Sequence, residues 1–200
     1  MIISLRCKEC RETLSGGKDE YLFICPNCGT LYLFREDRFD KTEAFITSGD
    51  SEFNILLTFL LFRSEVEYLD FSTNRQKEIS IRCGINPIIA VRAFSMIDPI
   101  YFGDMEIEIT AKINKSQTEI IPYSPHKKNF MMDIKPQILE RLARYTFMKY
   151  FDIQTDITGM KYSFKIESSA VLFLRGKVSG NKIIIPDINK EIPKSAILAI

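Results

Sequence analysis

The chain has 200 residues, 46% of them hydrophobic and 26% charged, so it is long enough for one domain with a sizeable core or for a small module joined to a larger one. Its 27 Lys and Arg against 26 Asp and Glu leave a net charge of +1, which argues against the strong overall positive field of a protein that coats nucleic acid. The composition also excludes collagen-like and compositionally disordered chains.

The first residues, MIISLRCKEC, lack the apolar stretch of a secretory signal, and we therefore expect a cytoplasmic protein. Two Cys-x-x-Cys pairs follow: Cys7 with Cys10 and, after fourteen intervening residues, Cys25 with Cys28. This spacing is one residue short of the usual range for zinc sites with four cysteines. Two residues between cysteines allow a tight turn to direct both thiolates at one point. The segments EYLFI and TLYLF are expected as the strands of a hairpin that brings the two turns together, with Gly16-Gly17 at its tip.

We therefore predict that the four cysteines bind one metal ion, which is zinc or, because tetrahedral sulfur suits both metals, iron. A thioredoxin-like redox site would use one Cys-x-x-Cys within a βαβ pattern, and disulfides are disfavoured in a cytoplasmic chain. Four protein ligands leave no coordination position for water or substrate. The predicted site is therefore structural and does no Lewis-acid chemistry.

Residues 1–35 resemble the zinc ribbon family, and Cys25-Pro26-Asn27-Cys28-Gly29 reproduces its knuckle as it also occurs in rubredoxins. The resemblance covers less than a fifth of the chain. It implies that the four cysteines are ligands on a three-stranded or hairpin scaffold. Zinc ribbons serve transcription factors, ribosomal proteins, primases and protein adaptors alike. The remainder of the chain resembles uncharacterised prokaryotic proteins in which a ribbon precedes a β-rich domain, and this likeness favours an adaptor over an enzyme.

We expect the chain to divide into a zinc ribbon at residues 1–40, a polar linker at 41–50 and a β-rich domain at 51–200. The apolar run Phe53–Phe62 is too short for a membrane-spanning helix and is expected as a buried strand. Short apolar or alternating patterns predict further strands in residues 65–71, 76–85, 87–94 and 105–113.

One principal helix is expected from Asp133 to Phe151, with Asp133 as its cap and Pro136 in its first turn. Strand patterns return after it, in residues 160–188. The predicted fold class is therefore α+β and sheet-dominated, with the small ribbon at the N-terminus.

The β-rich domain offers few residues with a chemical role. Cys83 is expected as a buried thiol within a strand, and Glu106 and Glu108 as a solvated face of another strand. Phosphate-binding loops, nucleophile elbows and metalloprotease motifs do not occur in the sequence. The sequence therefore predicts a protein that is not an enzyme, and an enzyme whose residues come together only in the fold is the third and last alternative.

Lys and Arg are in excess between residues 112 and 150, in a segment that also contains Tyr123, Phe130 and Tyr145. A solvated surface is the ordinary reading of such a segment. Binding of nucleic acid through Lys127, Lys128, Arg141 and Arg144 is the alternative. The function that we expect first is that of a non-enzymatic, zinc-binding adaptor or scaffold with a protein partner, without a membrane span. A nucleic-acid-binding protein is the second expectation.

Overall fold

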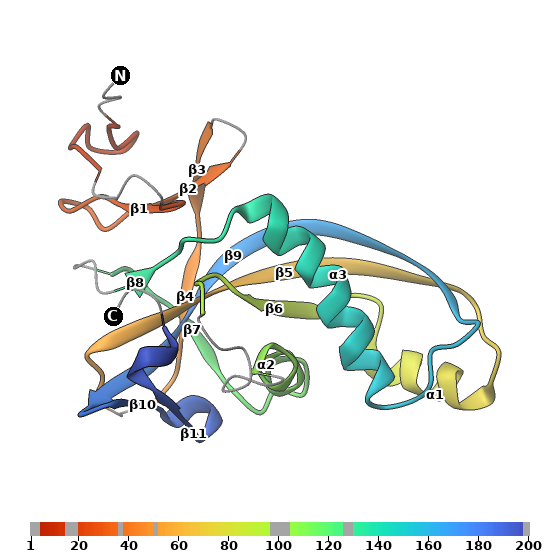
Figure 1. Cartoon of the computed structure of the whole chain (residues 1–200). Coiled ribbons are helices and arrows are strands. Elements are labelled where there is room, and N and C mark those ends of the chain that lie inside the picture. Colours follow the sequence, from red (N-terminus) through yellow and green to blue (C-terminus); the bar gives the residue numbers. More distant parts are fainter. Residues whose placement is uncertain are drawn as a thin grey trace.

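The computed structural model describes residues 5–14, 20–35, 38–49, 52–96, 105–125 and 130–197. Its central feature is a pair of long antiparallel strands, β5 (Ile55–Asp70) and β9 (Lys161–Ser179). They remain paired from Ile55 opposite Gly176 to Asp70 opposite Lys161. Figure 1 shows that this pair curves away from the body of the molecule as a two-stranded arm.

Outside the arm, β5 and β9 run through the body, where they belong to an eight-stranded sheet. β5 pairs antiparallel with β6 and parallel with β8, while β9 pairs with β4 and β10. β7 extends the sheet beyond β4, and β11 extends it beyond β10. The bounds of these strands are β4 (Ala44–Thr47), β6 (Ile88–Arg92), β7 (Ile120–Pro122), β8 (Phe130–Met131), β10 (Lys182–Ile185) and β11 (Lys190–Pro193). Two 3-10 turns, Pro186–Ile188 and Lys194–Ala196, flank β11.

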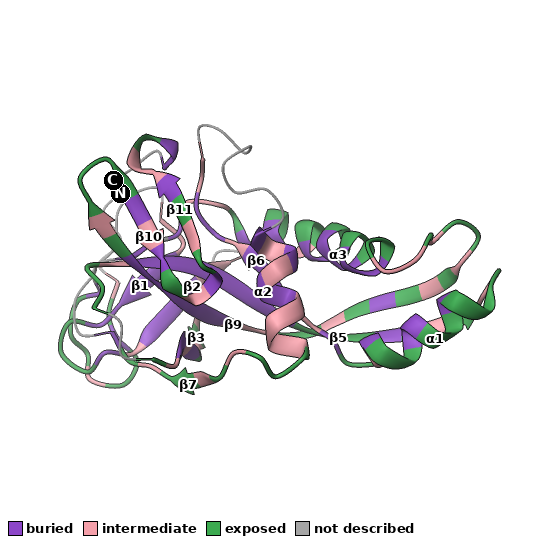
Figure 2. Cartoon of the chain, turned by 90° about the horizontal axis from the view of Figure 1, so that it is seen from below, coloured by how far each residue is buried: buried purple, intermediate pink, exposed green. Residues whose placement is uncertain are grey.

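Three helices complete this part of the described chain: α1 (Asn74–Cys83), α2 (Met105–Asn114) and α3 (Pro136–Asp152). α2 and α3 pack against β6 and against each other, and α1 lies at the far end of the arm (Figure 1). Figure 2 shows buried residues concentrated where β5 and β9 pass through the body, whereas the arm alternates between buried and exposed positions. The molecule is sheet-rich with helices, which confirms the expected α+β, sheet-dominated class.

The apolar run at residues 53–62 is confirmed as a buried strand from Ile55 on, because Leu56 to Phe62 of β5 are all buried, whereas Phe53 and Asn54 are exposed and precede the strand. The principal helix is confirmed as α3, with Pro136 at its first position. The predicted cap is wrong. Asp133 lies before the helix and its Oδ1 accepts a hydrogen bond of 2.7 Å from the backbone N–H of Ser95, while the N-cap residue is Lys135, without a side-chain capping bond.

Two expected strands are helices. Residues 76–85 belong largely to α1, which a capping box between Thr73 and Gln76 initiates, so Cys83 is a buried thiol at a helix end. Residues 105–113 form α2. Their alternation misled the prediction because the helix is buried on two sides: Ile107 packs into one hydrophobic cluster, whereas Met105 and Ile109 pack into another.

The segment 41–50, expected as a linker, carries the end of β3 (Arg38–Thr42) and the whole of β4. Ala44 and Ile46 of β4 are buried, and β4 runs parallel to β9 with Ala44 opposite Val171. Three consecutive apolar residues, Ala44, Phe45 and Ile46, are enough to fix a short strand once a larger sheet offers an edge. The division of the chain into two domains stays a prediction. Among the described helices, none has the length and apolar character to cross a membrane.

Candidate metal centre

The second cysteine pair lies at the tip of a hairpin. β1 (Leu22–Ile24) and β2 (Leu31–Arg35) pair antiparallel, and β3 adds to β2, which gives a three-stranded sheet. Within the turn between β1 and β2, Gly29 N–H donates to the Cys25 carbonyl and Cys25 N–H donates to the Thr30 carbonyl, both at 2.9 Å. Gly29 has φ of +71°, a left-handed conformation that glycine adopts without steric cost. The expected tip, Gly16-Gly17, lies outside the described residues.

The first cysteine pair occupies a similar turn. An isolated bridge between Arg6 and Thr13 closes it, and Cys7 N–H donates to the Glu12 carbonyl at 2.7 Å. Arg11 N–H donates to the Cys7 carbonyl at 3.0 Å, and Arg11 takes the left-handed φ of 68° just after the second cysteine. In both turns the backbone groups form hydrogen bonds within the turn, and the cysteine sulfurs of the two turns point towards each other.

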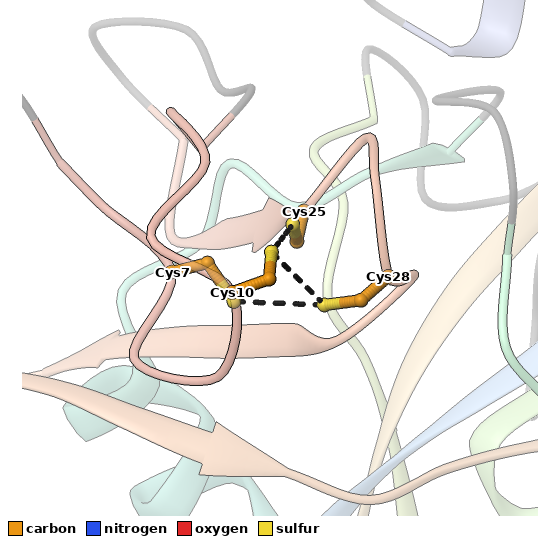
Figure 3. Close-up of side chains that lie close together, drawn as sticks. All are labelled: Cys7, Cys10, Cys25 and Cys28. Carbon is orange, nitrogen blue, oxygen red and sulfur yellow. Dashed lines mark hydrogen bonds between the residues drawn. The ribbon is translucent and has the colours of Figure 1, made fainter.

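All four Sγ atoms lie within 4.8 Å of one another. The distances are 3.6 Å from Cys7 to Cys28, 3.3 Å from Cys10 to Cys25 and 3.7 Å from Cys10 to Cys28 (Figure 3). In a tetrahedral site with Zn–S bonds of about 2.3 Å, neighbouring sulfurs lie about 3.8 Å apart. A disulfide requires about 2.05 Å, and all four cysteines are free thiols. The cluster therefore has the dimensions of a four-sulfur metal site.

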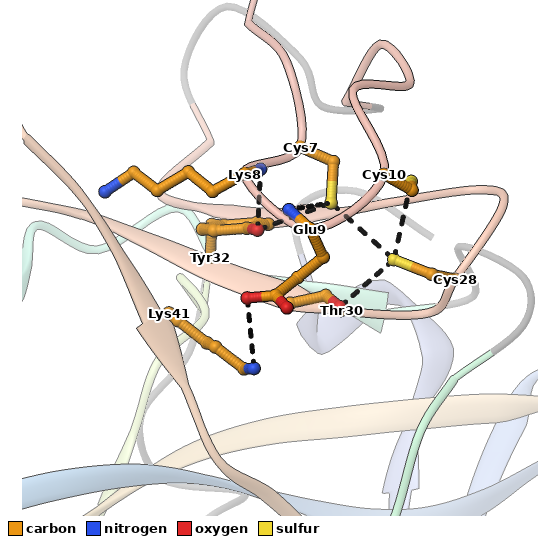
Figure 4. Close-up of polar contacts among 8 residues, drawn as sticks. All are labelled: Cys7, Lys8, Glu9, Cys10, Cys28, Thr30, Tyr32 and Lys41. Carbon is orange, nitrogen blue, oxygen red and sulfur yellow. Dashed lines mark hydrogen bonds and ion pairs between the residues drawn. The ribbon is translucent and has the colours of Figure 1, made fainter.

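Polar groups around the cluster lie within hydrogen-bonding distance of individual sulfurs (Figure 4). The Tyr32 hydroxyl lies 3.3 Å from Cys7 Sγ and accepts a hydrogen bond of 2.9 Å from Lys8 N–H, so the hydroxyl proton is free to point at the sulfur. Glu9 N–H donates to the same sulfur at 3.4 Å. The Thr30 hydroxyl lies 3.1 Å from Cys28 Sγ. These contacts are of the kind that orients metal ligands from outside the first coordination sphere.

The thiols differ in acidity. Burial favours the neutral form of Cys7, but hydrogen bonds from the Tyr32 hydroxyl and from backbone N–H groups outweigh it and lower the Cys7 pKa to about 6. Hydrogen bonds from Thr30 lower the pKa of Cys28. Burial raises the pKa of Cys25 to about 12, and it also raises the pKa of Tyr32 to about 12. Without a cation, the cluster favours ionisation on Cys7 and Cys28 and opposes it on Cys25.

The hairpin that carries the cluster has two different faces. Side chains alternate along β1 and β2, and Leu22, Ile24, Leu31 and Leu33 enter the main hydrophobic core of the body. Phe23, Cys25 and Tyr32 point the other way, into a small cluster with Cys7 and Leu14. Tyr21 N–H donates to the Met132 carbonyl at 3.1 Å and ties the start of the hairpin to the segment before α3.

Cys28 is the exposed member of the cluster. It lies at the rim of a hollow of about 700 Å³ that is also lined by residues 41–45 and 122–124. Cys7 and Cys25 are fully buried, and Cys10 is intermediate. The cluster is therefore exposed to solvent on the side of Cys28.

The residues proposed for nucleic acid lie elsewhere. Arg141 and Arg144 are exposed on α3, and the Arg144 guanidinium lies 5.8 Å from the centroid of the Phe164 ring. Lys127 and Lys128 lie outside the described residues. Sequence reasoning identified all four cysteines but missed Tyr32 and Thr30. The available signal was the alternation in TLYLF, which places Thr30 and Tyr32 on the same side of the strand, the side of the cysteines.

Comparisons with protein-family models, with curated proteins and with solved structures give no match. The assignment of the site therefore rests on the convergence of the four sulfurs.

Proposed function

We propose that Cys7, Cys10, Cys25 and Cys28 bind one structural zinc ion, and that the segment carrying them is a zinc ribbon. The observation that carries the proposal is the convergence of four Sγ atoms within 4.8 Å. The two cysteine turns and the antiparallel hairpin between β1 and β2 support it further. Zinc and iron both accept four thiolates, so metal analysis decides between them.

Such a site acts by holding the fold together. Four protein ligands complete the tetrahedral shell of zinc, so no position remains for a reacting water or substrate. Binding of structural zinc in small modules supplies folding free energy on the order of 10 kcal/mol at neutral pH. Free thiols also suit a reducing compartment, and we place the protein in the cytoplasm.

The proposed biochemical role is that of a non-enzymatic adaptor or scaffold that binds a protein partner. The exposed face of α3 supports this role, because Ile138, Leu142 and Tyr145 are 47%, 36% and 56% exposed. Their spacing of i, i+4 and i+7 places them on one stripe of the helix. Apolar stripes of this spacing are what helix-in-groove recognition uses.

Elemental analysis of protein purified under reducing conditions tests the metal. We expect about one zinc ion per chain. Cys25→Ser should lose the metal, whereas Cys83→Ser should keep it, because Cys83 is a buried thiol at the end of α1 and not part of the cluster. Stoichiometric iron would replace zinc in the proposal. A chain that folds without any transition metal would contradict the proposal.

Affinity purification tests the adaptor role. The variant Ile138→Glu/Tyr145→Glu changes two exposed side chains of the stripe, and Gln137→Glu is the matched control, since it adds charge at an exposed position beside the stripe. A partner that depends on α3 is recovered with the wild type and the control and is lost with the double variant. Equal recovery with all three proteins would remove α3 from the proposal.

Binding of nucleic acid is the second candidate. The observation that favours it is the exposed triplet Arg141, Arg144 and Tyr145 on one helix, which combines cations with an aromatic ring on which a base can stack. Affinity for single-stranded oligonucleotides should then fall steeply as salt rises, because counterions are released on binding. Arg141→Ala/Arg144→Ala should weaken binding, with Lys77→Ala on α1 as the control. Absence of binding at low salt would exclude this candidate.

A further inference from the structure

The arm formed by β5 and β9 has an open edge. From Lys161 to Ile166, β9 pairs with β5 on one side, and Glu167 lies at a register shift where it has no partner in β5. On its other side, β4 joins only at Val171 to Phe173, and no described strand pairs with residues 161–167 there. This is the outer side of the arm as it leaves the body in Figure 1.

The opposite edge of the arm is covered near the body. Ser64 N–H of β5 donates to the Pro87 carbonyl at 3.2 Å, and Val66 N–H donates to the Ile85 carbonyl at 2.7 Å. The connection from α1 to β6 therefore occupies the hydrogen-bonding groups of β5. β9 is left as the edge on which a further strand can pair. Unpaired edges are templates for such pairing, through rows of N–H and C=O groups.

The two faces of this β9 segment differ in character. Tyr162, Phe164 and Ile166 pack on the side of α3, where the Phe147 ring lies 5.4 Å from Tyr162 and 5.1 Å from Phe164 between centroids. Tyr162 and Ile166 are only partly buried there. The side chains of Lys161, Ser163, Lys165 and Glu167 alternate with these and are exposed.

The segment is complementary to itself when it is reversed. If two copies run antiparallel with Phe164 opposite its own equivalent, Lys161 of each copy faces Glu167 of the other. Tyr162 then faces Ile166, and Ser163 faces Lys165, so no like charges are opposed. Opposite charges and aromatic–apolar pairs are the cross-strand pairs that stabilise sheets. Glu167 has no ion-pair partner within the described part of the chain, and Lys161 has only a contact of 3.7 Å with the exposed Asp70.

We propose that two copies of this chain associate by antiparallel pairing of β9 residues 161–167. The pairing ends before Val171, where β4 already occupies the edge. It joins two arms into one four-stranded sheet about a two-fold axis, with both α3 helices on the same face. A two-fold interface uses the same surface on both partners, so its complementarity must lie within one sequence, as it does here.

Charge reversal tests this register. The homodimers of Lys161→Glu and of Glu167→Lys each oppose two pairs of like charges, so each variant should dimerise at least about tenfold more weakly than the wild type. A mixture of the two variants forms heterodimers in which the two acidic positions of one chain face the two basic positions of the other, so both cross-strand pairs are attractive again. Sedimentation equilibrium should therefore show heterodimers in the mixture. The double variant Lys161→Glu/Glu167→Lys should return to wild-type dimerisation.

Lys161→Glu also places a carboxylate beside Asp70. Repulsion between these two carboxylates would destabilise the arm of this single variant even if the chain did not dimerise. Only the proposed pairing predicts recovery on mixing, and this result decides the matter. Amide hydrogen exchange gives a second readout, since the edge amides of residues 161–167 should gain protection as protein concentration rises. A wild type that stays monomeric up to about 100 µM overturns the proposal. A dimer that none of the charge reversals affects does so as well.

Discussion

We expect substitution of Arg175 to destabilise the fold more than substitution of any other single polar side chain described. Its guanidinium donates to Asp187 Oδ1 at 2.7 Å, to the Ser48 carbonyl at 2.7 Å and to the Gly49 carbonyl, and both charged side chains are 5% exposed. Asp187 Oδ2 also accepts from the backbone N–H of Arg175 at 2.9 Å. The pair therefore ties the end of β4 to β9 and to the turn before β11.

Replacement of Arg175 by Met keeps much of the apolar volume but removes the cation. Asp187 then keeps one backbone hydrogen bond and loses its buried counter-charge, while two carbonyls lose their donors. Removal of one partner of a buried ion pair typically costs 3–5 kcal/mol, roughly the loss we expect for Arg175→Met. Lys112 does not compensate, because its Nζ bonds to the Asp187 carbonyl and pairs with Glu108.

Denaturant unfolding, followed by circular dichroism, measures the loss. Arg175→Met/Asp187→Asn removes the stranded charge and keeps an oxygen for the backbone N–H of residue 175, so it should recover part of the lost stability. Lys177→Met is the matched control, since Lys177 lies two residues along the same strand and pairs with Glu52 at the surface. Its cost should stay below about 1 kcal/mol. A loss below about 1 kcal/mol for Arg175→Met would refute the reasoning.

Three further predictions concern the hairpin, the metal and the arm. Leu33→Ala should lower the free energy of unfolding by about 2–5 kcal/mol in a melt, because Leu33 is 2% exposed within the main core, while the exposed Leu142→Ala should change it by less than about 0.5 kcal/mol. Acid should release the metal, since protons compete for the thiolates, and a colorimetric chelator should detect free zinc as pH falls while Cys83→Ser behaves like the wild type. Alkali should destabilise the arm. Burial raises the pKa values of Tyr68 and of Cys83 in the folded chain. As pH rises, both groups therefore ionise first in the unfolded chain. The stability that they contribute below their ordinary pKa values is lost as pH rises through their raised pKa values. Tyr68→Phe should flatten this alkaline loss, and an unchanged slope would contradict it.

The cysteine cluster could be predicted from the sequence because its signal is local. Two Cys-x-x-Cys turns define their own geometry, and the alternating strands beside them are short and apolar. The strand at residues 53–62 and helix α3 were readable for the same reason, since a long apolar run and a helical stripe depend little on their neighbours.

The errors lie where tertiary contacts decide. α2 was read as a strand because Met105, Ile107 and Ile109 alternate, and only the presence of two hydrophobic clusters on either side of the helix explains that pattern. β4 was read as linker because its few apolar residues acquire a meaning only when β9 lies beside them. Tyr32 escaped notice since its role depends on a sulfur 25 residues earlier in the chain.

The two faces of the β1–β2 hairpin connect the cysteine cluster to the rest of the fold. Leu22, Ile24, Leu31 and Leu33 belong to the same core as β5, β9 and α3, while the intervening side chains belong to the cysteine cluster. A hairpin with a three-residue strand such as β1 is marginally stable alone, and the proposed ion at its turn would add folding free energy. Loss of the proposed ion would therefore remove order from one wall of the main core as well as from the hairpin. The proposed structural zinc would act on the stability of the whole chain for this reason, even though the four cysteines lie within its first 28 residues.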